Sequence, residues 1–198
     1  MKALAAMPET DGHAEALIRI ALDTAWFSHA LKAVAALGPP SWCVGAGAVR
    51  NLVWDHLHGY DEPSRLADID VAYFDPTDLS AEREAGWQHR LQAAEPRYPW
   101  EVTNQARVHV WYESYFGYAV GPLHSLDEAV ATWPETATAV GLTLQPTGAP
   151  RVIAPFGLAD LFGMVVRRNP ARVSLEQYRR RIAEKRYAER WPQVTIVP

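Results

Sequence analysis

The apolar positions near the start of the chain recur with the spacing of a helix. Across residues 14–36 their spacing follows the helical period closely enough to place them on one helical face. The run is long enough for two helices or one bent helix. Gly38-Pro39-Pro40 ends it, because proline cannot continue a helix. The predicted stripe consists of Leu17, Ile20, Ala21, Trp26, Leu31 and Val34.

Short strands and helices are predicted to alternate in the next part of the chain. The strands are short apolar runs, and the helices follow turn residues such as glycine and proline. The predicted order is a strand at Trp42–Val44, a turn at Gly45–Gly47, a helix at Ala48–His58, a strand at Ile69–Phe74 and a helix at Leu79–Ala94.

Residues 100–112 show the longest alternation of apolar and polar side chains. One set of alternate residues is largely apolar, and the other is polar almost throughout. Because an extended chain sends alternate side chains to opposite faces, this pattern predicts a long strand. Glu101, Arg107 and His109 would share its polar face.

The last third of the chain predicts helices and one hairpin. Ser125 and Glu128 form a capping-box pattern at the start of a helix. A turn at Pro146-Thr147-Gly148 separates two strand-like segments that we expect to pair. The predicted elements are a helix at 125–132, strands at 139–144 and 151–153, and helices at 158–166 and 174–191.

Composition supports a globular protein. Hydrophobic residues make up 48% and charged residues 21% of the 198 positions, close to the averages of folded domains. The single cysteine, Cys43, cannot form an internal disulfide, and we expect it to be buried. The apolar stretch at the N-terminus is too short for the core of a signal peptide. No apolar run in the sequence approaches the roughly 18 residues of a membrane span. We therefore expect a cytoplasmic protein that does not enter membranes.

The net charge of −4 hides an asymmetry. Residues 1–150 carry a formal charge of −10, whereas residues 151–198 carry +6. A basic tail of this kind can meet a polyanion, or it can be a solvated helix face neutralised in part by nearby glutamates.

The first stretch with candidate chemistry runs from residue 44 to residue 51. A strand, a turn of small residues and a helix N-terminus place free backbone N–H groups where they can bind an anion. Gly45, Ala46 and Gly47 let phosphate oxygens approach the backbone. Arg50, in the first turn of the helix, can add charge-assisted hydrogen bonds.

The second stretch is Asp68-Ile69-Asp70. Residues two apart on a strand face the same way, so both carboxylates would project from one face. Carboxylates held this close repel each other unless a cation lies between them, and oxygen ligands suit Mg²⁺ or Mn²⁺. A third carboxylate on a neighbouring strand would allow two ions about 3.5–4 Å apart.

These two stretches resemble the nucleotidyltransferase superfamily that includes polymerase beta. The segments Ala46–Asn51 and Asp68–Asp70 are similar to the Gly-Gly-x-Val-Arg-Asp and Asp-x-Asp motifs of CCA-adding enzymes and bacterial poly(A) polymerases. Segments 100–109 and 154–161 resemble an uncharacterised bacterial group of small nucleotidyltransferases within that superfamily. The resemblance covers most of residues 40–192.

The resemblance implies roles for particular residues. Asp68, Asp70 and Glu101 would bind two Mg²⁺ or Mn²⁺ ions and act as the catalytic carboxylates. The triphosphate would be held by Gly45, Ala46, Gly47 and Arg50. Independently of the resemblance, Arg107 and His109 share the predicted strand face of Glu101, so they would either touch nucleotide or acceptor phosphate or form a hydrogen-bonded structural pair. Glu113 and Asp75 are alternatives to Glu101 as the third carboxylate. The sequence departs from the motif at Ala46, where the family has the first glycine, and at Asn51, where it has aspartate.

The predicted fold class is α+β: a small mixed β-sheet nucleotidyltransferase core flanked by N- and C-terminal helices. We expect residues 1–125 to hold the N-terminal helices and catalytic core. Residues 126–198 would form a basic helical and hairpin portion packed on that core.

Three functional hypotheses follow. The first is metal-dependent transfer of a nucleoside monophosphate from a nucleoside triphosphate to a hydroxyl, with release of pyrophosphate. The acceptor stays open between RNA, a protein side chain and a small molecule such as an aminoglycoside. The second is a degenerate member that binds nucleotide or RNA without catalysis, and the third is a hydrolase that uses the same metals.

Overall fold

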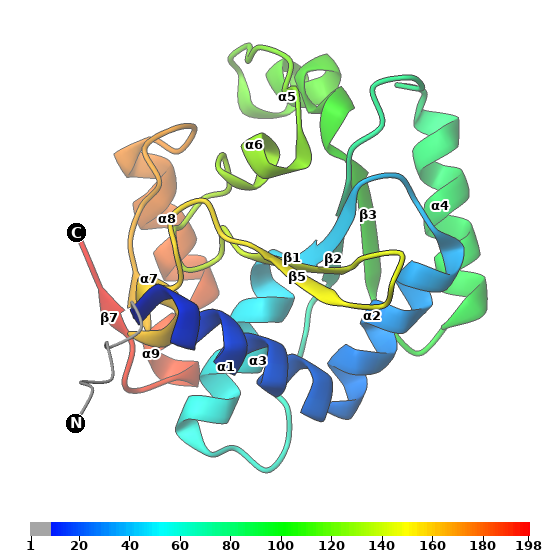
Figure 1. Cartoon of the computed structure of the whole chain (residues 1–198). Helices are drawn as coiled ribbons and strands as arrows, with labels where there is room; N and C mark the ends of the chain where they lie inside the picture. The colour runs from blue at the N-terminus through cyan, green and yellow to red at the C-terminus, as the bar shows by residue number, and fades with distance from the viewer. Residues whose placement is uncertain (1–8) are drawn as a thin grey trace, which may run out of the picture.

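The computed structural model describes residues 9–198 and shows a mixed sheet flanked by helices (Figure 1). The five strands of this sheet are β1 (Trp42–Gly45), β2 (Ile69–Tyr73), β3 (Trp100–Asn104), β4 (Gly141–Leu144) and β5 (Pro150–Ile153). Their order is β3-β2-β1-β4-β5. Strands β2 and β3 are parallel, whereas the other neighbouring pairs are antiparallel. The predicted α+β class and mixed sheet are confirmed.

Helices precede, connect and follow the strands. The first four are α1 (Glu9–Asp23), α2 (Ala25–Leu37), α3 (Ala46–His58) and α4 (Ala81–Ala94). The later ones are the 3-10 turn η1 (Gln105–Arg107), α5 (Val108–Phe116), α6 (Leu126–Val130), α7 (Ala159–Phe162), α8 (Leu175–Lys185) and α9 (Tyr187–Arg190). A two-stranded parallel sheet joins β6 (Val165–Val166) to β7 (Thr195–Ile196). In the part of the chain that the structure describes, no helix is long and apolar enough to span a membrane.

One face of the large sheet carries the main hydrophobic core. Alternate residues of β2, Ile69, Val71 and Tyr73, point into it and pack with residues of α1 to α4. The opposite face has a smaller cluster around Cys43 and Ala72, covered by α6. Asp70 has the same parity as Ala72, so it projects from this second, incompletely covered face.

Local sequence signals explain several element boundaries. The predicted helical run splits at Thr24 into α1 and α2, and Gly38 ends α2 in the left-handed conformation that glycine adopts without strain. Helix α4 begins two residues later than predicted, because the Ser80 hydroxyl caps it by accepting a hydrogen bond from Arg83 N at 3.2 Å. The predicted hairpin is present as β4 and β5.

The predicted long strand over 100–112 is wrong beyond Asn104. There the chain turns through η1 into α5. The buried Asn104 side chain accepts hydrogen bonds from Asp75 N and Ala106 N, both at 3.1 Å, which fixes the turn. Arg107 and His109 therefore do not extend the strand face of Glu101. Local alternation could not reveal this side-chain capping.

Two predicted C-terminal helices are shorter than expected. The helix predicted over 158–166 ends at Phe162, because Met164 has a φ of +52° and the chain then enters β6. The helix predicted over 174–191 is divided by Arg186, which has a φ of +50°. Its start is as predicted: Ser174 and Gln177 form a capping box.

Candidate active site

A pocket of about 250 Å³ lies at the incompletely covered face of the sheet. Its walls come from the turn between β1 and α3, from β2 and β3, and from the C-terminal helices. Six of the predicted site residues line the pocket, namely Asp68, Asp70, Glu101, Ala46, Gly47 and Arg50. The predicted Gly45 lies next to Ala46 but does not line the pocket. The fold thus brings together segments that lie more than 100 residues apart.

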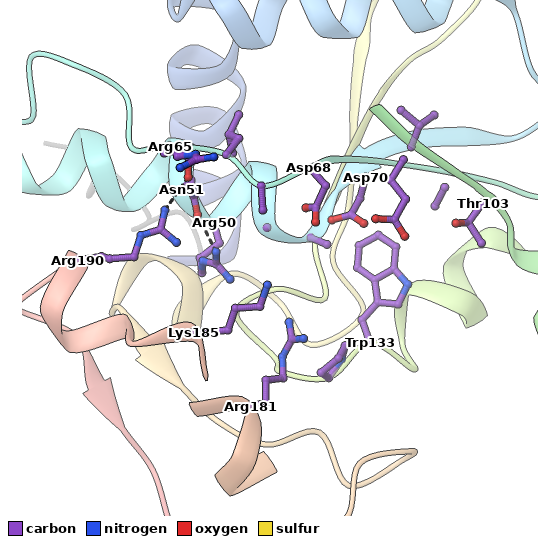
Figure 2. A pocket seen from close by; sticks show the side chains of 18 of the residues that line it. Arg50, Asn51, Arg65, Asp68, Asp70, Thr103, Trp133, Arg181, Lys185 and Arg190 are labelled. Atoms are coloured by element: carbon purple, nitrogen blue, oxygen red, sulfur yellow. Dashed lines mark hydrogen bonds between the residues drawn. The ribbon is translucent and has the colours of Figure 1, made fainter. Parts of the chain in front are cut away.

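The three predicted carboxylates are neighbours. Asp70 lies directly across from Glu101 in the parallel pairing of β2 and β3, and Asp68 immediately precedes β2. Parallel partners in register present their side chains on the same face of the sheet. Figure 2 shows the carboxylates of Asp68 and Asp70 side by side at the pocket.

The carboxylates affect each other's protonation. Burial raises the pKa of Asp70 to about 7, and the charges of Asp68 and Glu101 act in the same direction, whereas a hydrogen bond from Gly47 N opposes the shift. Partial burial and the Asp68 charge also raise the pKa of Glu101, and Lys185 lowers it. The site therefore concentrates negative charge that a cation would relieve.

The donor set fits a hard cation such as Mg²⁺ in its chemistry. Within residues 9–198, no group of three or more histidine, cysteine, aspartate or glutamate side chains is arranged as a ready metal cage. Mg²⁺ does not need such a cage, since it keeps several waters and is held by one or two carboxylates together with substrate phosphates. Among residues 9–198, the carboxylates that line the pocket are those of Asp68, Asp70 and Glu101.

At the turn where β1 passes into α3, other groups can come close to the backbone. A Cβ added at Gly45 would lie 2.7 Å from the Trp133 ring and 2.9 Å from the Val140 carbonyl oxygen, so only glycine fits there. Ala46 has a φ of +50°, a conformation in which glycine is relaxed and alanine is strained. Gly47 has open space on its pocket side, with Arg50 and Asp70 atoms at 3.7 and 3.9 Å from the position of a Cβ.

Arg50 is a buried cation held mostly by aromatic rings. The residue is only 4% exposed, and its guanidinium carbon lies 5.0–5.6 Å from the ring centroids of Trp54, Tyr187 and Trp191. Asn51 accepts a hydrogen bond from Arg50 Nη2 at 2.7 Å, whereas Arg50 Nε has no hydrogen-bond partner among residues 9–198. Burial lowers the pKa of Arg50. A buried cation without a bonded carboxylate is well suited to meet a phosphate.

A basic wall that local sequence reasoning missed faces the carboxylates. Arg181 and Lys185 of α8 line the pocket, as does Arg190 of α9 (Figure 2). Arg181 forms an ion pair with Glu135, which is 1% exposed. The basic tail is the only signal in the sequence, and it does not indicate which side chains reach the site.

Trp133 is a second missed residue. Figure 2 shows its indole between Asp70 and Arg181, and its ring packs against Gly45. It lies in the loop after α6, whose sequence has no motif that would mark it as part of a site.

The remaining candidates lie elsewhere. Arg107 donates to Leu79 O at 3.1 Å and to Glu84 Oε1 at 2.9 Å, and it does not line the pocket. Asp75 is buried and accepts hydrogen bonds from Thr77. Glu113 is an exposed residue of α5 outside the pocket. The geometry thus favours Glu101 among the three candidate third carboxylates.

Comparison with known proteins gives a consistent picture. A family model described as nucleotidyltransferase matches residues 32–196. A protein whose NMR structure reveals a CCA-adding enzyme head domain is 27% identical, with a TM-score of 0.77, over 92% of this chain and 95% of that one. No curated protein matches.

Two larger structures share the fold. A CCA-adding enzyme in complex with CTP is 14% identical with a TM-score of 0.57, over 93% of this chain and 43% of that one. The Thermotoga maritima CCA-adding enzyme complexed with tRNA is 15% identical with a TM-score of 0.55, over 93% and 42%. The chain therefore spans less than half the length of these two enzymes.

Proposed function

Because the chain belongs to the nucleotidyltransferase family whose model covers residues 32–196, we propose that it transfers a nucleoside monophosphate from a nucleoside triphosphate to a hydroxyl acceptor. The observation that carries the proposal is the register of β2 and β3. It sets Asp70 opposite Glu101, beside Asp68, in a pocket that also holds buried and exposed cations.

Asp68, Asp70 and Glu101 would hold divalent ions, Mg²⁺ or Mn²⁺. When bound, such ions supply charge that neutralises the reacting phosphates and lowers the pKa of an attacking hydroxyl. The relief of repulsion among the three carboxylates would favour this binding, since burial and neighbouring charges already raise the pKa of Asp70.

The chain's own residues would position the triphosphate. The N-terminus of α3 lines the pocket with the positive end of its helix dipole, and Arg50 offers a cation that is not paired with a carboxylate. From the opposite wall, Arg181 and Lys185 add positive charge. These contacts would hold the α-phosphorus near Glu101, and such positioning supplies much of the rate in phosphoryl transfer.

The proposed reaction is a displacement at the α-phosphorus. The acceptor hydroxyl oxygen forms a bond to that phosphorus while the bond to the bridging oxygen of the β-phosphate breaks. Pyrophosphate leaves, and the hydroxyl proton passes to the Glu101 carboxylate. Glu101 suits this role because it is the most exposed of the three carboxylates that line the pocket.

A transfer assay with α-phosphate-labelled nucleotides, Mg²⁺ or Mn²⁺ and a panel of acceptors tests the proposal. Asp70→Asn should reduce transfer by about 100-fold or more, the usual effect of removing a main electrostatic contributor. Glu101→Gln should reduce transfer to a similar extent. Glu113→Gln serves as a matched control and should leave transfer unchanged. A folded Asp70→Asn protein with full activity would contradict the assignment.

A catalytically degenerate nucleotide-binding protein is the second candidate. Two observations favour it: strained Ala46 stands where the related motif has glycine, and neutral Asn51 stands where it has aspartate. Calorimetry with Mg²⁺ and each nucleotide, run beside the transfer assay, separates the two. Binding without transfer to any acceptor would favour the degenerate protein.

A further inference from the structure

A second hollow, of about 650 Å³, adjoins the pocket of the candidate active site. The two hollows share Asp70, Glu101, Thr103, Gln105, Trp133, Pro134 and Arg181. Two substrates could therefore reach the same carboxylates from different sides. The smaller hollow holds the glycine turn and Arg50, so the larger one is free for the acceptor.

We call the larger hollow the aromatic groove. Helix α5 forms one of its walls. Trp111, Tyr115 and Phe116 line it, and Tyr115 is 77% exposed. The Tyr115 ring lies 6.3 Å from that of Trp111 and 4.7 Å from that of Phe116, both edge-on. Large aromatic side chains gathered on a surface mark an interaction site, and their free faces can stack on planar groups.

Arginines line the same aromatic groove. Arg172 lies with its guanidinium carbon 5.2 Å from the Tyr112 ring, and Arg180 has an 81% exposed side chain. Glu184 offsets part of this charge, because it pairs with Arg180 at 2.8 Å. Arginines beside aromatic faces match the phosphates and bases of a nucleic acid strand, and they disfavour a polycationic small molecule.

The floor of the groove offers hydrogen-bonding groups. Thr103 and Gln105 line both hollows next to the carboxylates, where a terminal ribose would have to lie. Hydroxyl and amide side chains there can bind a 2′-hydroxyl, the group that distinguishes RNA from DNA.

We propose that the aromatic groove binds the single-stranded 3′ end of an RNA, with bases stacked on Tyr115 and Trp111 and the terminal ribose directed to Glu101. This inference rests on the proposed nucleotidyl transfer and names its acceptor. The arginines would contact the phosphates, so affinity would fall steeply as salt concentration rises.

Binding of a 12-nucleotide single-stranded RNA with a 5′ fluorescein label tests the groove by anisotropy in the presence of Mg²⁺. Tyr115→Ala should weaken binding by about tenfold, within the range expected when one base loses its aromatic platform. Tyr115→Phe keeps the ring and should bind like the wild type. Val110→Ala is the matched control, since Val110 is 59% exposed on the same helix but does not line the groove. Equal affinity of Tyr115→Ala and wild type would overturn the proposal.

Transfer and nucleotide binding separate this inference from the function on which it rests. The wild type should lengthen the RNA but not the same RNA with a 3′-deoxy end, and a DNA of the same sequence should be a poorer acceptor. Tyr115→Ala should lengthen it more slowly and bind nucleoside triphosphate normally. Transfer to a protein or small molecule without any RNA extension would overturn the groove assignment alone. Absence of both nucleotide binding and transfer would overturn the proposed function as well.

Discussion

Asp70→Asn should stabilise the metal-free protein at alkaline pH. Burial, Asp68 and Glu101 raise the pKa of Asp70 from 3.8 to about 7 in the folded protein. At about 1.4 kcal/mol per pKa unit, a fully buried carboxylate would lower the free energy of unfolding by about 4 kcal/mol once it ionises. Since the side chain is partly exposed, we expect about 2 kcal/mol.

The pH dependence gives this prediction its sign. The folded protein binds the Asp70 proton more tightly than the unfolded chain does, so the free energy of unfolding falls as the pH rises from about 4 to about 7. Asparagine has no such proton. The variant should therefore unfold about 4–8 °C above the wild type at pH 8, and the two should converge near pH 4.

Thermal unfolding in EDTA across this pH range measures the effect. Asp160→Asn is a control of opposite sign: burial raises the pKa of Asp160, but hydrogen bonds from Arg167 and Thr136 outweigh it and leave the pKa below its ordinary value. That variant should be less stable than the wild type at pH 8. Mg²⁺ should stabilise the wild type and not Asp70→Asn. If Asp70→Asn were less stable than the wild type at pH 8 in EDTA, the carboxylate would be a structural partner, and the reasoning would fail.

Three further substitutions test the packing of the site. Gly45→Ala should cost about 1–3 kcal/mol in urea unfolding, because its Cβ would overlap the Trp133 ring, and an unchanged midpoint would refute this. Ala46→Gly should stabilise slightly, by up to about 1 kcal/mol, since it removes the left-handed strain; a clear loss of stability would argue against that strain. Arg181→Met should cost about 3–5 kcal/mol by leaving Glu135 buried and unpaired, and combining it with Glu135→Gln should recover much of this loss; no recovery would exclude the buried charge as the cause.

Short-range patterns in the sequence predict much of the framework of the fold. The strand, small-residue turn and helix around Gly45 to Arg50 follow from local backbone preferences, as do the capping serines and the hairpin of β4 and β5. Asp68 and Asp70 are expected together because a separation of two residues fixes their common direction in an extended chain. These features depend on neighbours in the chain.

Local patterns fail where side chains from distant segments intervene. The alternation of apolar and polar residues continues to residue 112, yet the strand ends at Asn104. The side-chain amide of Asn104 forms hydrogen bonds with the backbone of the loop after β2 and with the backbone of the next turn. Arg107 consequently contacts Glu84 of α4 and not the pocket. No periodicity records such a contact.

The sequence by itself determined which residues could bind metal and phosphate, since residue type and spacing are local properties. Only the tertiary structure decided which of them meet: the register of two parallel strands sets Glu101 beside Asp70, and the packing of α8 brings Arg181 and Lys185 to the same pocket. The physical reason is that the regular geometry of a helix or strand fixes the direction of side chains over only a few residues. Contacts over more than 100 residues depend on how whole apolar faces pack into one core.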